Sequence, residues 1–259
     1  MESQRMTTGR DHLARLNPSA ETALHASLDD IAPDMPALVT AFAYGDIYAR
    51  PGLAPPERQV ATVAALTALG NAEAQLKFHI DGGLNVGLSP EEIVETLYVT
   101  TVFAGFPAGL NALAVARQVF TARGVQPARP TLPPGERRSR GLAALEATSQ
   151  GAGQKVLDSL SDIAPDMADF ILDFAYGDVL SRPALSPRRK EIAMLAASMA
   201  RGTMRPQLMV HAKAGLNVGL TRQEQVEVAM QMSVYAGFPA ALNGLAALRE
   251  AFAEVNTAQ

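Results

Sequence analysis

The stretch Phe42-Ala43-Tyr44-Gly45-Asp46 decides how the chain is organised, because it returns unchanged at residues 174–178. Other segments return with the same displacement of 132 positions, namely residues 31–35 at 163–167, 83–88 at 215–220, 104–108 at 236–240, and His79 as His211. A similarity of about 100 residues in constant register indicates one duplicated domain, whereas a solenoid needs shorter and more numerous repeats. The sequence therefore predicts two copies of one fold.

The length of the chain, 259 residues, allows two domains that each bury a core of their own. We expect the first domain at residues 19–124 and the second at residues 152–256. Residues 125–151 lie between them and combine several prolines with several glycines, a composition typical of an extended linker.

The chain contains no cysteine, and this excludes several kinds of chemistry at once. Disulfides, thiolate metal sites, cysteine nucleophiles and thiol peroxidase activity all need that residue. Of the four histidines, only His79 and His211 are related by the repeat, which argues against a multi-histidine metal centre within one copy. We predict neither a bound metal nor a cofactor.

Charge and hydropathy exclude two classes of partner. A formal net charge of -4 without a basic run on a periodic segment predicts no nucleic-acid binding. No apolar run reaches the ~18 to 20 residues that cross a bilayer, and residues 1–18 are too polar for a signal peptide. We therefore expect a soluble, cytoplasmic protein with a small-molecule substrate and no membrane partner.

Periodicity predicts an all-α fold. Ala and Leu dominate, apolar residues recur every three or four positions, and the alternation of Val, Ile and Thr typical of strands is missing. Between residues 56 and 69 apolar positions surround most of the helix, which indicates a buried core helix. The expected helices of the first copy span residues 19–28, 34–48, 56–69, 73–84, 89–104 and 107–123.

The clearest helix start is Ser89-Pro90-Glu91-Glu92. It offers an N-cap serine, a proline at the first helical position and a glutamate at the third, which together make a capping box. Thr221 and Glu224 keep this box in the second copy, where the proline is missing.

His79 and His211 are candidate catalytic residues, because glycine or alanine stands three and four positions after each of them on the same helix. A bare surface beside an imidazole leaves room for a ligand. A histidine that faces a pocket can act as a general acid or base without a metal. Alternatively, the small residues let another helix cross closely, and the histidine fills a gap or caps a carbonyl.

Glu191 is the candidate partner of His211, and here the two copies differ. It lies on the core helix, twenty residues before the histidine, where the first copy has Gln59. A glutamate buried there could orient the imidazole or exchange a proton with it, whereas a glutamine could only orient it. Alternatively, Glu191 is a surface carboxylate beside the basic residues 188–190.

Several repeated polar positions carry weaker signals. Arg50 and Arg182 each follow an aspartate of the repeated stretch by four positions, so an Arg–Asp pair could build a polar network at a helix end. Tyr235 takes the position of Phe103, which gives the second copy a hydroxyl that the first copy lacks. Asn243 and its counterpart Asn111 could be buried hydrogen-bonding residues or could line a pocket.

In both copies the ordered motifs resemble the carboxymuconolactone decarboxylase family, over residues 20–124 and 152–255. They are Phe-Ala-Tyr-Gly-Asp followed by Arg-Pro, His-x-x-Gly-x-Leu-Asn-x-Gly in the first copy with Ala for the first Gly in the second, the capped helix start, and Ala-Gly-Phe-Pro-Ala. The resemblance implies an all-helical domain of the alkyl hydroperoxidase D type that assembles into rings. Two fused copies then imply a homotrimer that imitates a hexamer, with active sites at domain interfaces.

The resemblance also implies roles for single residues. Relatives include cofactor-free decarboxylases of cyclic lactone acids and cysteine-dependent peroxidase-like proteins. Leu88 and Leu220 stand where close relatives often carry the cysteine, so the second group is excluded. The family histidine corresponds to His79 and His211, and a helix glutamate seen in many relatives corresponds to Glu191.

These observations lead to one main hypothesis, a cofactor-independent, decarboxylase-like lyase or isomerase that acts on a small carboxylated or lactone-type ring. His211 would handle the proton, with Glu191 orienting it and His79 as the second candidate. The expected substrate-binding residues are Tyr176, Arg182, Tyr235, Asn243 and Gln59. The alternatives are a tailoring enzyme of secondary metabolism that guides a cyclisation or dehydration, and a ligand-binding or structural protein without catalysis.

Overall fold

The computed structural model describes residues 3–129 and 131–258, and within these ranges it is helical and contains no β-strand. The predicted all-α fold is therefore confirmed. The first repeat contains α1 (Gln4–Leu16), α2 (Ala20–Leu28), α3 (Met35–Leu38), η1 (Val39–Tyr48), α4 (Pro55–Leu69), α5 (Glu73–Asn85), α6 (Pro90–Ala104) and α7 (Phe106–Arg123). The second contains α8 (Arg137–Ser149), α9 (Ala152–Asp158), α10 (Pro165–Phe170), η2 (Ile171–Leu180), α11 (Pro187–Arg201), α12 (Arg205–Asn217), α13 (Arg222–Tyr235) and α14 (Phe238–Ala258).

Both predicted capping boxes are formed. The Ser89 hydroxyl accepts a hydrogen bond from the Glu92 backbone N–H at 3.2 Å, and the Glu92 carboxylate accepts one from the Ser89 N–H at 3.0 Å. Thr221 and Glu224 repeat this exchange at the start of α13. No helix in the described parts of the chain combines the length and apolarity of a membrane span.

The prediction of an extended linker over residues 125–151 is wrong for the second half of this stretch, because helix α8 occupies Arg137–Ser149. This helix is the counterpart of α1, and both cross a neighbouring helix at a glycine. A Cβ on Gly9 would lie 2.2 Å from the Thr40 carbonyl oxygen, and a Cβ on Gly141 would lie 2.3 Å from that of Leu172. The repeat therefore begins before residues 19 and 152, and the exact division into domains stays a prediction.

The repeated stretch Phe-Ala-Tyr-Gly-Asp forms part of a π-helix in each copy, η1 and η2. This winding is rare and occurs mostly as single turns, frequently at functional sites. The sequence predicted one helix over residues 34–48, and the structure divides it into α3 and η1.

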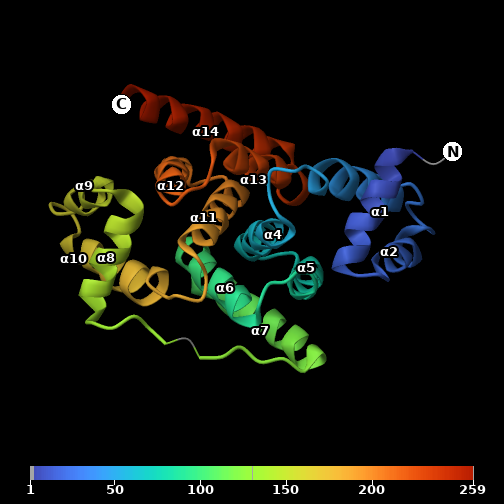
Figure 1. The fold of residues 1–259 in the computed structure, drawn as a ribbon, viewed down its shortest axis with the longest axis horizontal. Coiled ribbons are helices and arrows are strands. Elements are labelled where there is room, and N and C mark those ends of the chain that lie inside the picture. The colour runs from blue at the N-terminus through green and yellow to red at the C-terminus, as the bar shows by residue number, and fades with distance from the viewer. Residues whose placement is uncertain (1–2, 130, 259) are drawn as a thin grey trace.

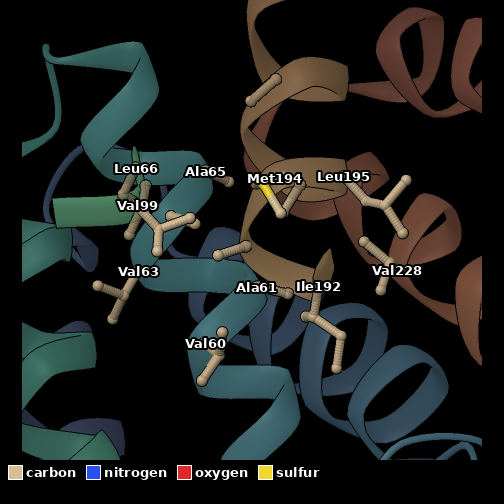
Figure 2. Close-up of a cluster of buried hydrophobic side chains, with 14 of the residues drawn as sticks. Val60, Ala61, Val63, Ala65, Leu66, Val99, Ile192, Met194, Leu195 and Val228 are labelled. Atoms are coloured by element: carbon tan, nitrogen blue, oxygen red, sulfur yellow. The ribbon is translucent and has the colours of Figure 1, made fainter. Parts of the chain in front are cut away.

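The core is shared by the two repeats. α4 and α11 pack directly against each other, and Figure 2 shows Ala61 and Ala65 of α4 facing the side of α11 that carries Ile192 and Met194. These side chains are at most 1% exposed, and they belong to one cluster that contains residues of both copies. The prediction of a buried core helix at residues 56–69 is confirmed. Small residues at the crossing let the two backbones approach closely.

The repeats also exchange contacts at their edges. η1 packs against α13 of the second repeat, and η2 packs against α6 of the first. In Figure 1, α1 and α2 lie at one end of the long axis and α8 to α10 lie towards the other, with α4 and α11 between them. Residues from both repeats therefore meet on either side of the central helix pair.

The expected pairing of Arg with Asp within one repeat is wrong. Arg50 reaches across to Glu227 of α13 at 2.9 Å, and Arg182 reaches across to Glu95 of α6 at 2.7 Å. The aspartates of the repeated stretch pair instead with the first arginines of α1 and α8, Asp46 with Arg5 and Asp178 with Arg137. The cause is the exchange between repeats, which brings a buried glutamate within reach of each arginine.

Candidate functional site

The first histidine site is built on α5 and α4. His79 Nδ1 lies 2.9 Å from Gln59 Oε1, and its Nε2 lies 3.2 Å from the hydroxyl of Tyr235. An amide oxygen can only accept, so Nδ1 carries the proton and Nε2 accepts from the tyrosine. Both ring nitrogens of this histidine are therefore occupied.

A chain of hydroxyl groups continues from Tyr235. Its oxygen lies 2.6 Å from the Tyr48 hydroxyl of η1, which lies 2.8 Å from Thr62 Oγ1 of α4. Gln231 Nε2 donates to Thr62 Oγ1 at 2.8 Å, so the threonine donates onward to Tyr48. The donors thus run in one direction, from Gln231 through Thr62, Tyr48 and Tyr235 to His79.

Burial makes this network neutral. His79 is 3% exposed, and burial lowers its pKa to about 3. Burial also raises the pKa of Tyr48, although its hydrogen bonds act in the opposite direction. A neutral imidazole with both nitrogens hydrogen-bonded has no lone pair to offer a ligand.

The second histidine site repeats the first pair with a carboxylate. His211 Nδ1 of α12 lies 2.9 Å from Glu191 Oε2 of α11. The Glu191 side chain is 1% exposed and the His211 side chain 12%. In the described ranges of the chain no group hydrogen-bonds to His211 Nε2. The structure thus brings the two residues together and leaves one imidazole nitrogen without a partner.

The surroundings of the second pair are apolar. The ring of Phe103 meets the imidazole of His211 edge to face, with 5.1 Å between the ring centroids. At the repeat positions of Tyr48, Thr62 and Gln231 the second site has Leu180, Met194 and Val99, which belong to or pack against the core cluster. Each hydroxyl or amide group in the hydrogen-bond chain around His79, apart from Gln59, therefore has an apolar side chain as its counterpart in the second site.

Tyr176 is a half-buried neighbour of this pair. Burial, and after it the negative charge of Glu191, raises the pKa of Tyr176 to about 12, while a hydrogen bond with Thr148 acts in the opposite direction. The phenol therefore stays protonated near neutral pH, close to the glutamate.

Arg182 is bound by Glu95 of the first repeat. Its Nε donates to the carboxylate, and its guanidinium lies 4.8 Å from the centre of the Tyr98 ring. Burial raises the pKa of Glu95 in spite of Arg182 and the nearby Lys190. Lys190 donates to the carbonyl oxygens of Leu180 and Arg182, and burial lowers its pKa to about 8.

Asn243 lies in another place again. It is exposed, so the buried alternative is wrong, and it lines a cavity of about 280 Å³ with Ser198, Arg205 and Leu208. The counterpart Asn111 lines a cavity of about 260 Å³ in the first repeat. His211 is not among the lining residues of either cavity.

Tyr235 differs most from expectation. The sequence placed its hydroxyl in the second copy, but the structure gives it to His79 of the first. Tyr48, Thr62 and Gln231 were missed altogether. The alignment of the two copies does mark these three positions, because each is polar where the other copy is apolar. That they share one site can be recognised only once the contacts between the repeats are known.

Metal-ligating side chains do not gather in the described part of the chain. No group of three or more His, Cys, Asp or Glu residues there could hold a metal ion. The second pair therefore offers acid–base groups in an apolar setting, and the first offers a closed hydrogen-bond network.

Comparison with known proteins gives consistent matches. The model of the carboxymuconolactone decarboxylase family matches residues 33–118 and, a second time, residues 165–250. The chain is 34% identical over 101 residues to a 4-carboxymuconolactone decarboxylase of Acinetobacter baylyi, covering 39% of this chain and 75% of that protein. It is 30% identical over 83 residues to a nitrosuccinic acid decarboxylase of Metarhizium robertsii, covering 32% and 57% respectively.

A solved structure resembles the whole chain. It is a protein from Burkholderia xenovorans assigned as a gamma-carboxymuconolactone decarboxylase subunit, with a TM-score of 0.59 and 25% sequence identity. The match covers 97% of this chain and 98% of that one, so both repeats are included.

Proposed function

Because the chain belongs to the carboxymuconolactone decarboxylase family, we propose that it is a cofactor-independent, decarboxylase-like lyase whose working site is the pair His211–Glu191. The named decarboxylases among its relatives support a decarboxylase-like function at the level of the family. A small carboxylated or lactone-type ring is the substrate class that we infer from the 4-carboxymuconolactone decarboxylase among them.

The observation that carries the proposal is the state of the His211 ring. Its Nδ1 is held by a buried carboxylate and its Nε2 has no partner in the described ranges. A carboxylate at Nδ1 fixes the tautomer and stabilises the imidazolium, so Nε2 can both accept and return a proton. An apolar wall strengthens this charge interaction because it excludes water.

The proposed reaction uses this arrangement. The bond between a ring carbon and its carboxylate breaks, carbon dioxide leaves, and the electron pair stays on the carbon. The His211 imidazolium then donates the Nε2 proton to this carbon, and the imidazole regains a proton from solvent. Glu191 holds Nδ1 and stabilises the cationic form of the ring.

The proposed site is smaller than the set of residues singled out in the sequence. Tyr176 remains a neighbour of the proposed site, because the negative charge of Glu191 helps to raise the pKa of its phenol. Tyr235 and Gln59 belong to the network of His79, and Arg182 is bound by Glu95. Asn243 lines a separate cavity. We therefore place none of these four in the substrate site.

The test is release of carbon dioxide from a panel of small cyclic carboxylic and lactone acids. His211→Ala is expected to lower turnover by at least a hundredfold, since a positioned acid–base group contributes about 10² to 10⁴ in rate. His79→Gln is expected to keep turnover within about twofold. Thermal melting of each variant separates loss of chemistry from loss of fold. Unchanged turnover in His211→Ala would contradict the proposal.

We also propose that the chain associates with itself, as a homotrimer that imitates a hexamer. Large apolar side chains are exposed in pairs at the repeat displacement, which is a pattern that a lone monomer does not explain. The pairs are Ile31 and Ile163, Met35 and Met167, Leu38 and Phe170, Phe106 and Phe238, and Leu110 and Leu242. Sedimentation that yields a single monomeric species would contradict this.

A further inference from the structure

One position in each site differs by a single hydroxyl and lies in the same place relative to the histidine. The centroid of the Phe103 ring is 5.1 Å from that of His211, and the centroid of the Tyr235 ring is 5.1 Å from that of His79. Both rings meet the imidazole edge to face, at 69° for Phe103 and 89° for Tyr235. The two aromatic side chains therefore pack against their histidines at the same centroid distance and in similar edge-to-face arrangements.

The Tyr235 hydroxyl binds His79 Nε2, the imidazole nitrogen that would have to be free for catalysis. Tyr235 donates to His79 Nε2 at 3.2 Å, and it is itself bonded to Tyr48 at 2.6 Å. The phenylalanine has no donor, and His211 Nε2 has no other partner within residues 3–129 and 131–258. The neighbouring position differs in the same way, since Leu180, which has no hydroxyl, replaces Tyr48.

We propose that Phe103 is the positioning residue that keeps the reactive nitrogen of His211 free, and that the tyrosine hydroxyl at the equivalent position closes the site of His79. Phe103 comes from the first repeat and His211 from the second, so the control acts across the repeats. It also forms the apolar wall next to the histidine, which favours an apolar ring over a polar group on that side of the substrate. The consequence for turnover rests on the proposed function, but the state of the nitrogen does not.

The test compares Phe103→Tyr with Phe103→Leu, using diethyl pyrocarbonate, which acylates a free imidazole nitrogen. Labelling of each histidine is followed by peptide mass spectrometry near neutral pH, with His12 and His25 as internal references. In the unsubstituted protein His211 is expected to react much faster than His79. The added hydroxyl is expected to slow labelling of His211 by about twofold to tenfold, the factor that corresponds to one hydrogen bond. The leucine variant, which adds no donor, is expected to label at least as fast as the unsubstituted protein.

The outcomes separate the two proposals. If Phe103→Tyr labels as fast as the unsubstituted protein while its melting temperature is unchanged, the inference is overturned, whatever His211→Ala does to turnover. If the labelling contrast holds but His211→Ala keeps full turnover, the inference stands and the proposed function fails. Equal slowing in Phe103→Tyr and Phe103→Leu also overturns the inference, because it would trace the effect to packing and not to the hydroxyl.

Discussion

The sites of His79 and His211 occupy equivalent places in the two repeats and differ in what surrounds the imidazole. Around His79, hydroxyl and amide groups from α4, η1 and α13 form a chain that ends on the ring. Around His211, the corresponding side chains are apolar and one ring nitrogen has no partner in the described ranges. Polar groups satisfied by one another stabilise a fold, whereas a reactive group must be left partly unsatisfied. The two copies of the site thus differ in how far the hydrogen-bonding groups of the histidine are satisfied within the described ranges.

The difference extends to the buried carboxylate beside each site. Glu227 accepts from both Arg50 and Arg58, and these contacts lower its pKa although burial acts in the opposite direction. Glu95 accepts from Arg182 alone, its Oε2 has no partner, and burial raises its pKa. Glu227 is thus fully paired, whereas its repeat counterpart Glu95 is poorly paired.

The largest expected effect comes from this pair of carboxylates. Glu227→Gln leaves the Arg58 guanidinium, 1% exposed, without a counter-charge, and is expected to lower the free energy of unfolding by about 3 to 5 kcal/mol. Glu95→Gln should cost only about 1 kcal/mol, the worth of one hydrogen bond. Urea denaturation of both variants measures the two changes, and equal losses would remove the contrast.

The second expected effect is on turnover. Glu191→Gln gives the His211 site the same His–amide pair that the His79 site has, and the side chain keeps nearly the same volume. An amide does not stabilise the imidazolium, so turnover should fall about a hundredfold. Gln59→Ala removes the amide that contacts His79 and should leave turnover unchanged. Equal turnover in Glu191→Gln and the unsubstituted protein would show that the carboxylate has no role.

The third prediction reverses the comparison. Gln59→Glu combined with Tyr235→Phe gives the His79 site a carboxylate at Nδ1 and removes the donor at Nε2. Both changes favour the protonated ring, so the pKa of His79 should rise from about 3 by roughly two units. An NMR titration of the His79 ring measures the rise. A pKa that stays near 3 would show that burial alone sets it.

The effect that is smallest at neutral pH is on the pH dependence of stability. The pKa of His79 is lowered to about 3 in the fold, so the unfolded chain binds this proton first as the pH falls below about 6.5. Above that value the histidine has no such effect, and below it the free energy of unfolding falls by about 1.4 kcal/mol per pH unit until about pH 3. In His79→Gln this part of the slope should disappear. Parallel unfolding curves at pH 7, 5 and 4 would decide it.

The sequence predicted those features that depend on local pattern. The core helix, the two capping boxes and the repeat follow from periodicity and from residue types at fixed positions, and the structure shows all three. The spacing of twenty residues also brought each histidine next to the residue in question, Gln59 or Glu191. Their chemical roles stay predictions.

Features that depend on contacts between repeats could not be predicted. The partner of Arg50, the position of Tyr235 and the hydroxyl chain all arise where α13 meets η1, and no local pattern encodes that meeting. The helix α8 was missed for a different reason, because the prolines and glycines around its start are typical of a linker. The repeat displacement does link Gly9 with Gly141 and Arg5 with Arg137, and a longer comparison of the two copies would have revealed it.

The aromatic side chain at each histidine comes from the other repeat, through α13 for His79 and through α6 for His211. A substitution in one half of the gene therefore changes the chemistry of the other half. Neither half can be deleted, or replaced by recombination with a relative, without altering both histidine sites. Duplication in this chain has produced two interdependent parts of one heritable unit, not a spare copy that is free to drift.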